Sequence, residues 1–421
     1  MSIYLDRYAY PPLNFQSPTN ANTGIIIVIP VFNEERTITA LNSLIASALP
    51  DTNTEVLIII NQSIDCDAAI AKQNEVTQLE IQHWIKHNLK AGIQFYVTKI
   101  ELPKKHAGVG LARKAGMDEA VRRFEEIGND KGVILCYDAD CTCSSNYIKE
   151  VYSTFESKQL KGASINFQHL LDGLTLTVQN GIIQYELHLR YYVNGLRKAG
   201  YPYAFHTIGS SMAVRTDIYK KAGGMNKRKA GEDFHFLHKI IPYGKYEEIT
   251  NVTVYPSARV SDRVPFGTGK AMGEWVEKGG KQLCSYHPQI FNEVAQLLKL
   301  VPKFYRSKNL QDEINNLSEG VKDYLLKENF ETIFKDIQRQ SNNLSTFIHR
   351  WYNWLNGLKA LHLVHFLRNH YYPSIAISKA ASQLIEVGTT NSSDLLRTYQ
   401  KMDVDFTADQ ISLKHLYSEF L

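Results

Sequence analysis

Two aspartates separated by one residue follow a mostly apolar run in the stretch GVILCYDADC, residues 132–141. The run Val133–Tyr137 is typical of a buried strand, because strands favour β-branched and aromatic residues. Asp138 and Asp140 would then lie on the same side of an extended segment, where two carboxylates repel each other unless a positive charge lies beside them. Carboxylates, together with substrate phosphates, hold Mg²⁺ or Mn²⁺. We therefore predict that this pair binds such an ion; a turn or helix cap is the alternative for the pair alone.

Strands and helices alternate over the first 140 residues, which predicts an α/β domain with a mainly parallel sheet. Strands are expected at 25–29, ended by Pro30, at 55–61, at 93–100 and at 132–137, and helices from Glu34 onward, over 67–88 and over 108–127. Ligands of such sheets bind beyond the carboxyl ends of the strands. The segments 30–34, 61–65 and 138–140 all lie at such ends, so we expect the ligand site there.

The chain is less regular after about residue 160 and becomes helical beyond about residue 300. A strand and a helix are expected within 203–224, a turn opening a helix within 230–241, and helices near 310–340, 344–370 and 374–388. Trp351, Trp354 and Leu355 have helical spacing, which is typical of a core stripe, with a partner or membrane face as the alternative. We expect an N-terminal arm over 1–23, a main domain over 24–298 and a helical region over 299–421.

Composition argues against several classes of protein. The net charge of +4 is too small to indicate nucleic acid or an anionic membrane as the main partner. No apolar run approaches the roughly 20 residues of a membrane span, and the first residues lack the apolar core of a signal peptide. Five cysteines in 421 residues form no disulfide framework, so we expect the cytoplasm. The clusters Lys104–Lys105 and Lys227–Lys229 are typical of solvated faces, with anions such as phosphates as the alternative partner.

Five stretches, taken in order, make the chain resemble family 2 glycosyltransferases of the GT-A fold, which is Rossmann-like. They are IIIVIPVFNEERTITALNSL, GVGLARKAGMDEAV, GVILCYDAD, IGSSMAVRTDIYKKAGG and GEDFHF. The resemblance covers about residues 24–270 and does not extend to the chain after about residue 300. It implies an α/β GT-A domain followed by a C-terminal helical extension, Mn²⁺ or Mg²⁺ as cofactor, and a nucleoside diphosphate sugar as donor.

The resemblance implies that the segment after the first strand binds the nucleotide. Pro30, Phe32, Asn33 and Glu34 would line it, with Phe32 where the family often stacks an aromatic ring on the base. Asn61 stands where the family usually has a carboxylate that reads the base. Because an amide both donates and accepts hydrogen bonds, uracil stays the first choice.

Further matches fall on charged residues. Arg113 matches a position that contacts the nucleotide; a surface arginine on a helix is the alternative. Asp138 would contact the ribose or the metal, and Asp140 would bind the metal directly. Arg259 or Arg263, in a polar loop with glycines, could reach the diphosphate. The third metal ligand is unassigned.

The stretch GEDF matches the family's catalytic base at Asp233. A base is needed because a sugar hydroxyl is a poor nucleophile until it loses its proton. Glu232 is interpreted as structural, as an acidic residue in the first turn of a helix. His235 and His238 are spaced for metal binding, but packing is favoured because no third ligand is evident nearby.

We therefore expect a metal-dependent glycosyltransferase, with inverting transfer favoured, that moves a sugar from a UDP-sugar to an acceptor hydroxyl on a glycan, a lipid-linked sugar or a small molecule. A retaining GT-A enzyme, which would not use Asp233 as acceptor base, and a non-catalytic nucleotide-sugar-binding scaffold are the alternatives. No nucleic acid partner is expected. The helical tail is a candidate for the acceptor site or for a homodimer contact.

Overall fold

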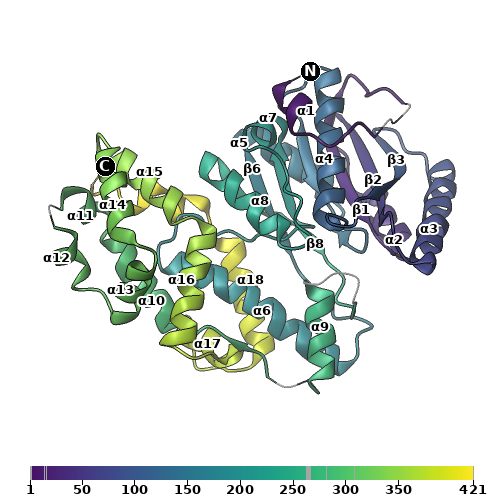
Figure 1. Cartoon of the computed structure of the whole chain (residues 1–421). Coiled ribbons are helices and arrows are strands. Elements are labelled where there is room, and N and C mark those ends of the chain that lie inside the picture. The colour runs from purple at the N-terminus through teal and green to yellow at the C-terminus, as the bar shows by residue number, and fades with distance from the viewer. Residues whose placement is uncertain are drawn as a thin grey trace. The chain divides into compact units, whose positions relative to one another are not determined.

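The computed structural model describes residues 2–13, 15, 17–261, 267–280, 282–307 and 309–420. The chain divides into two compact units (Figure 1). Unit 1 comprises Met1–Val178 and Thr207–Lys278, and unit 2 comprises Gln179–His206 and Gly279–Leu421. These limits differ from the predicted 24–298 and 299–421, because residues 179–206 and 279–298 pack with the helical unit.

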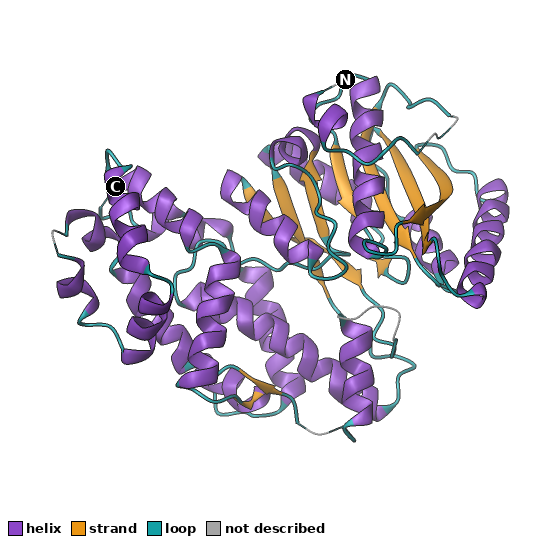
Figure 2. Ribbon diagram, viewed as in Figure 1, coloured by secondary structure: helices purple, strands orange, loops and turns teal. Residues whose placement is uncertain are grey.

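Unit 1 is built around an eight-stranded sheet with the order β3-β2-β1-β4-β7-β6-β8-β5; its strands are drawn in orange in Figure 2. The strands are β1 Thr23–Val31, β2 Asn53–Ser63, β3 Ile93–Leu102, β4 Val133–Cys136, β5 Thr142–Cys143, β6 Gly162–Phe167, β7 Met212–Arg215 and β8 Tyr246–Tyr255. Strands β1 to β4 run parallel, whereas β7 pairs antiparallel with both β4 and β6. The expected α/β architecture with a mainly parallel sheet is confirmed.

Strand β1 is buried along its whole length. A strand covered on both faces requires apolar residues at successive positions, as the sequence from Ile25 to Ile29 provides. The expectation that Pro30 ends the strand is wrong, since Pro30 pairs with Ile59 of β2. The Val28 carbonyl points toward β4, since it accepts a hydrogen bond from Tyr137 N–H at 3.1 Å. Residues two apart in a strand point the same way, so the Pro30 nitrogen also faces the β4 side. Pairing with β4 has ended there, so the missing N–H costs no ladder hydrogen bond.

Unit 1 also contains several helices. They are α1 Ile3–Arg7, α2 Thr37–Ala46, α3 Ala68–His87, α4 Val109–Glu126, α5 Tyr147–Lys158, α7 Thr216–Lys221, α8 Glu232–Ile240 and α9 Thr268–Glu277, with a 3₁₀ turn at Ile241–Tyr243. Helix α4 crosses β1 closely, because a Cβ on Gly116 would lie 2.4 Å from Val28 Cγ1. The N-terminal arm is held to this helix: Tyr4 Oη and Tyr10 N–H donate to the buried Asp118 carboxylate at 2.6 and 2.7 Å.

Helix α2 begins at Thr37, not at Glu34 as expected. Asn33 has a left-handed φ of 47°, which interrupts any helix. The Glu34 carboxylate accepts from Arg36 N–H at 2.8 Å and so holds the residues before the helix in a loop. The segment after β1 is therefore irregular, which places Glu34 at the strand end and not on a helix.

Unit 2 is almost entirely helical, which confirms the expected C-terminal helical region. Its elements are α6 Leu176–Lys198, most of which lies in this unit, α10 Gln289–Lys299, α11 Val301–Arg306, α12 Leu310–Ile314, α13 Glu319–Lys327, α14 Phe330–Arg339, α15 Leu344–Trp354, α16 Gly357–His370, α17 Ile377–Leu384, α18 Ser392–Asp405, α19 Leu413–Leu416, a 3₁₀ turn at Ala408–Ile411, and the paired strands β9 Cys284–Ser285 and β10 Ile375–Ala376. Trp351 and Leu355 are fully buried, so the predicted stripe is core. Among helices of the described residues, none combines the length and apolar character needed to cross a bilayer.

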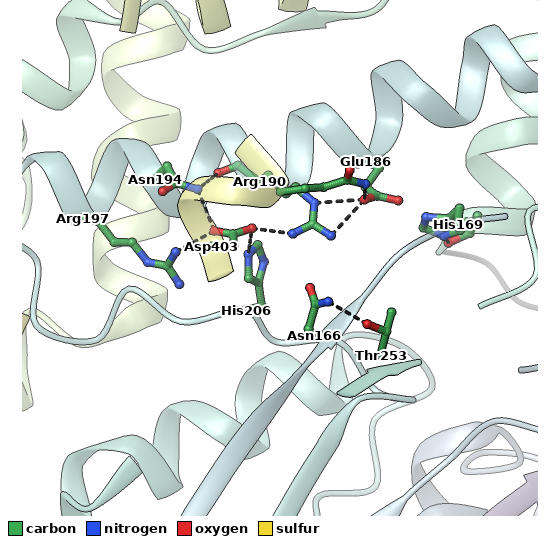
Figure 3. A network of polar contacts seen from close by, with 11 residues as sticks. Asn166, His169, Glu186, Arg190, Asn194, Arg197, His206, Thr253 and Asp403 are labelled. Atoms are coloured by element: carbon green, nitrogen blue, oxygen red, sulfur yellow. Dashed lines mark hydrogen bonds and ion pairs between the residues drawn. The ribbon is translucent and has the colours of Figure 1, made fainter. Parts of the chain in front are cut away.

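A network of buried charges joins α6 to α18 within unit 2 (Figure 3). The Asp403 carboxylate accepts from Arg190 at 2.5 Å, Arg197 at 2.6 Å, Asn194 at 2.9 Å and His206 at 3.0 Å. Burial alone would raise the pKa of Asp403, but His206 and the two arginines together hold it well below its usual range. The carboxylate is therefore charged throughout the physiological range, and α6 and α18 share one anion.

Asp403→Ala should lower the free energy of unfolding by about 3–5 kcal/mol, because it leaves buried cations without their shared anion. The measurement is urea unfolding of the full chain followed by tryptophan fluorescence. The exposed Asp405, also on α18, provides the control: Asp405→Ala should change stability by less than about 0.5 kcal/mol. Because the folded-state pKa is depressed, the contribution of Asp403 is fully present above the ordinary aspartate pKa of about 3.9 and is lost only as pH falls toward the folded-state value. Equal unfolding midpoints for the two variants would contradict this role.

Candidate functional site

A pocket of about 480 Å³ lies at the carboxyl ends of the parallel strands β1 to β4. Its lining residues are Pro30, Phe32 and Glu34 after the core of β1, Asn61 and Ser63 of β2, Cys66 and Ile70 beyond it, Lys104 and Ala107–Val109 after β3, Asp138–Asp140 after β4, and Lys229. The carboxyl ends of parallel strands share one edge of a sheet, where ligands of α/β folds bind. The three segments that the sequence placed at strand ends therefore meet in one cavity.

Asp138 and Asp140 both reach this pocket, although not from an extended segment as expected. They lie in a tight turn, closed by a 3.1 Å hydrogen bond from Cys141 N–H to the Asp138 carbonyl. Asp138 accepts from Arg113 Nη2 at 2.6 Å, and Asp140 lies 3.3 Å from Arg259 Nη2. A guanidinium beside each carboxylate relieves the repulsion between them.

Arg113 is buried beneath the pocket and does not line it. Its Nη2 donates to Asp138, and its Nη1 contacts the Glu232 carboxylate. Arg113 was predicted to contact the nucleotide, but its guanidinium is directed to two carboxylates and not into the pocket. Its place between two carboxylates from distant segments makes it a residue that positions both of them.

Glu232 and Asp233 open helix α8 directly after Gly231, whose left-handed φ of 65° turns the chain into the helix. Burial raises the pKa of Glu232 to about 7, against the opposing effect of the Arg113 guanidinium. Burial also raises the pKa of Asp233, again opposed by Arg113, while Asp233 Oδ1 accepts from Phe234 N–H at 2.7 Å. Carboxyls with raised pKa values are stronger proton acceptors than ordinary ones, and adjacent groups of this kind are typical of general acid–base sites.

Asn61 and Phe32 occupy the part of the pocket between β1 and β2. Asn61 is buried, and its Nδ2 donates to the Val31 carbonyl at 2.8 Å. One N–H of the amide is used in this bond, and Oδ1 can accept a hydrogen bond from a ligand. Asn33 does not line this pocket; its N–H donates to Asn74 Oδ1 at 3.0 Å and holds the loop after β1 against α3. Of the four residues predicted in this segment, Pro30, Phe32 and Glu34 line the pocket and Asn33 does not.

Lys104 and Lys229 line the pocket but were not among the predicted site residues. Each belongs to a cluster of basic residues that was predicted to face solvent, with binding of phosphates as the alternative. One lysine of each cluster lines the pocket. Lys104 Nζ lies 2.7 Å from the Asp65 carboxylate, and Lys229 Nζ donates to the Lys104 carbonyl at 3.1 Å. The signal available in the sequence was the proximity of each cluster to a matched motif, GVGLARKAG or GEDF.

Of the loop arginines, Arg259 contacts Glu34 as well as Asp140, so it is tied to the acidic side of the pocket. Arg263 lies outside the described residues. His238 packs on Phe234 with 4.4 Å between ring centroids, and burial lowers its pKa to about 4, so the ring is neutral. This arrangement agrees with packing as the role of His238.

The chain matches known proteins at the level of family. Residues 26–223 match the family described as glycosyl transferase family 2. No curated protein matches the chain. Solved structures that resemble it include S. aureus TarS 1-349 in complex with UDP-GlcNAc, at 14% identity and a TM-score of 0.39 over 94% of this chain and 92% of that chain. GalNAc-T7 with UDP, GalNAc and Mn²⁺ is 15% identical, with a TM-score of 0.37 over 61% of this chain and 48% of that one.

Gly110→Ala should damage the site through a backbone clash. A Cβ on Gly110 would lie 2.1 Å from the Arg228 carbonyl oxygen and 3.1 Å from Glu232 Cβ. The segment before α8 must then move and take Glu232 away from Arg113, at a cost of roughly 1–3 kcal/mol in stability. Chemical unfolding measures this, with Gly388→Ala as the control, since a Cβ on Gly388 would meet nothing within 4 Å. If the two variants unfold alike, α4 and this segment do not constrain each other.

Proposed function

Because this chain carries a glycosyl transferase family 2 domain over residues 26–223, we propose that it transfers a sugar from a UDP-sugar to an acceptor hydroxyl, with Mn²⁺ or Mg²⁺ as cofactor and inversion at the anomeric carbon. The family match confirms the expected class of enzyme, a glycosyltransferase of the GT-A type. The observation that carries the proposal is the pocket itself. It gathers an aromatic ring, an amide and three carboxylates from the ends of β1, β2 and β4.

The donor's base is proposed to bind beside Phe32 and Asn61, which both line the pocket. The Phe32 ring offers an aromatic surface for stacking. Asn61 Oδ1 offers an acceptor, because Nδ2 is held by the Val31 carbonyl. Uracil presents an imide N–H to such an acceptor, which supports UDP as the nucleotide.

The pocket residues fit a hard divalent ion. Glu34, Asp138 and Asp140 all line the pocket and provide the oxygen atoms that Mg²⁺ and Mn²⁺ prefer. Arg113 contacts Asp138 through Oδ1, and Oδ2 accepts no hydrogen bond from the part of the chain that the structure describes. When bound, the ion would neutralise charge that develops on the leaving diphosphate. Arg113 would meanwhile fix the orientation of the Asp138 carboxylate.

Asp233 is proposed as the general base that takes the proton of the acceptor hydroxyl. Its raised pKa makes it a better proton acceptor than an ordinary aspartate. Glu232 stays in contact with Arg113 and has a structural role. A retaining enzyme would not need this base, so the anomeric configuration of the product distinguishes the two mechanisms. A non-catalytic scaffold would hydrolyse or transfer no donor sugar.

Asp233→Asn should reduce transfer by at least roughly 10²-fold, the usual worth of general-base help, with little change in donor affinity. Steady-state transfer and calorimetric donor binding measure the two effects, and Glu232→Gln should be milder. Since the base must be deprotonated, the acid limb of the wild-type pH–rate profile should lie above the ordinary aspartate pKa of about 3.9, as the raised pKa of Asp233 requires. Near-normal transfer by Asp233→Asn would show that the base is misassigned.

Removal of the metal should weaken donor binding. We expect UDP to bind more weakly in EDTA than in Mn²⁺, because the ion adds a double positive charge between the two aspartates and the diphosphate. Asp140→Asn should reduce binding in Mn²⁺ and abolish transfer while the circular dichroism spectrum stays unchanged. Calorimetry with UDP measures the affinities. Equal affinity with and without the ion would rule out a metal at this site.

A further inference from the structure

Two lysines that belong to none of the matched motifs line the proposed donor pocket. Lys104 lies in the connection from β3 to α4, and Lys229 lies just before α8. We propose that Lys104 and Lys229 form a diphosphate clamp, a pair of ammonium groups that binds the donor's two phosphates whether or not a metal ion is bound. This inference rests on the proposed function, since it assigns residues to the donor's diphosphate.

Both ammonium groups are available to a ligand. Lys229 Nζ makes no ion pair with any described residue; its one polar contact is the hydrogen bond to the Lys104 carbonyl, 3.1 Å long. Lys104 pairs with Asp65 at 2.7 Å, but the two side chains are 81% and 43% exposed. An ion pair this exposed contributes little free energy, so Lys104 can release Asp65 and bind a phosphate at little energetic cost.

The guanidinium groups near the pocket are already engaged with carboxylates. Arg113 is buried between Asp138 and Glu232, and Arg259 contacts Glu34 and Asp140. These arginines offset the acidic groups of the site. Within the described ranges, the two lysines are therefore the cations of the pocket lining that no buried carboxylate holds.

The backbone that carries the lysines is held in place. The Lys229 backbone lies against the start of α4, since a Cβ on Gly108 would be 3.4 Å from Lys229 Cα. The hydrogen bond from Lys229 to the Lys104 carbonyl joins the two segments at the pocket. Lysine is a flexible point charge on a long stem, so both ammonium groups can adjust to a diphosphate without movement of the backbone.

The test is calorimetry on the full chain with UDP, uridine and inorganic pyrophosphate, each in EDTA and in Mn²⁺. Lys104→Met and Lys229→Met should each weaken UDP and pyrophosphate about tenfold, the loss expected for one hydrogen bond to a charged group, and leave uridine unchanged. Lys105→Met and Lys227→Met are the controls, because both lysines are exposed neighbours that do not line the pocket. Both controls should bind like wild type.

The preference of the wild type for UDP over uridine should persist in EDTA, shrink with added salt, and disappear in the double variant. Unchanged UDP and pyrophosphate binding in the Lys104 and Lys229 variants would overturn the clamp. Equal losses of affinity in the variants and the controls would also overturn it, since they would indicate an effect of the protein's overall positive charge. If wild type does not bind UDP but binds pyrophosphate through these lysines, the clamp stands and the UDP donor fails. If wild type binds neither, both proposals fail.

Discussion

The buried guanidinium of Arg113 is the interaction on which the site depends. It connects Asp138, which follows β4, to Glu232, which opens α8, and neither carboxylate is near the other in sequence. Burial of a charge is costly unless its partners are well placed, so the three side chains must be held together. Because Arg113 comes from α4, the position of that helix on the sheet determines where the two acidic motifs meet.

Close packing of α4 provides that position. Gly116 lets the helix approach β1, and Gly110 lets the segment before α8 approach the helix, since a Cβ at either place would meet a heavy atom within 2.4 Å. Glycine is used where two backbones must come close. The sheet, the helix and the GEDF segment thus form one rigid frame around the pocket, and the pKa shifts of Glu232 and Asp233 follow from burial in that frame.

Positive charge serves two different purposes around the pocket. Arg113 and Arg259 offset carboxylates that lie close together, which allows three acidic side chains to share one cavity. The planar, permanently charged guanidinium suits that role. Lys104 and Lys229 lie at exposed positions of the pocket lining, where an ammonium group remains hydrated and accessible to a ligand. The site therefore has two groups of cations, one held by buried carboxylates and one at the exposed part of the pocket lining.

Much of unit 1 could be predicted from local sequence alone. Apolar runs predicted the parallel strands, glycines and helical periodicity predicted α4, and the order of five short motifs predicted the family. These features depend on residues close together in the chain. The left-handed turn at Asn33, the continuation of β1 through Pro30 and the packing of 179–206 with the helical tail depend on contacts with distant segments.

The same distinction holds for the site. Residue types and spacing pointed to Asp138 and Asp140, and the resemblance to a family pointed to Asn61 and Asp233, because each belongs to a short motif that can be recognised locally. Only the tertiary structure decided that Arg113 turns inward to carboxylates and that Lys104 and Lys229 come to one pocket. A charged side chain can face water, a ligand or a buried partner, and the choice depends on which segments the fold places around it. That information lies in long-range packing and not in the identity of the residue.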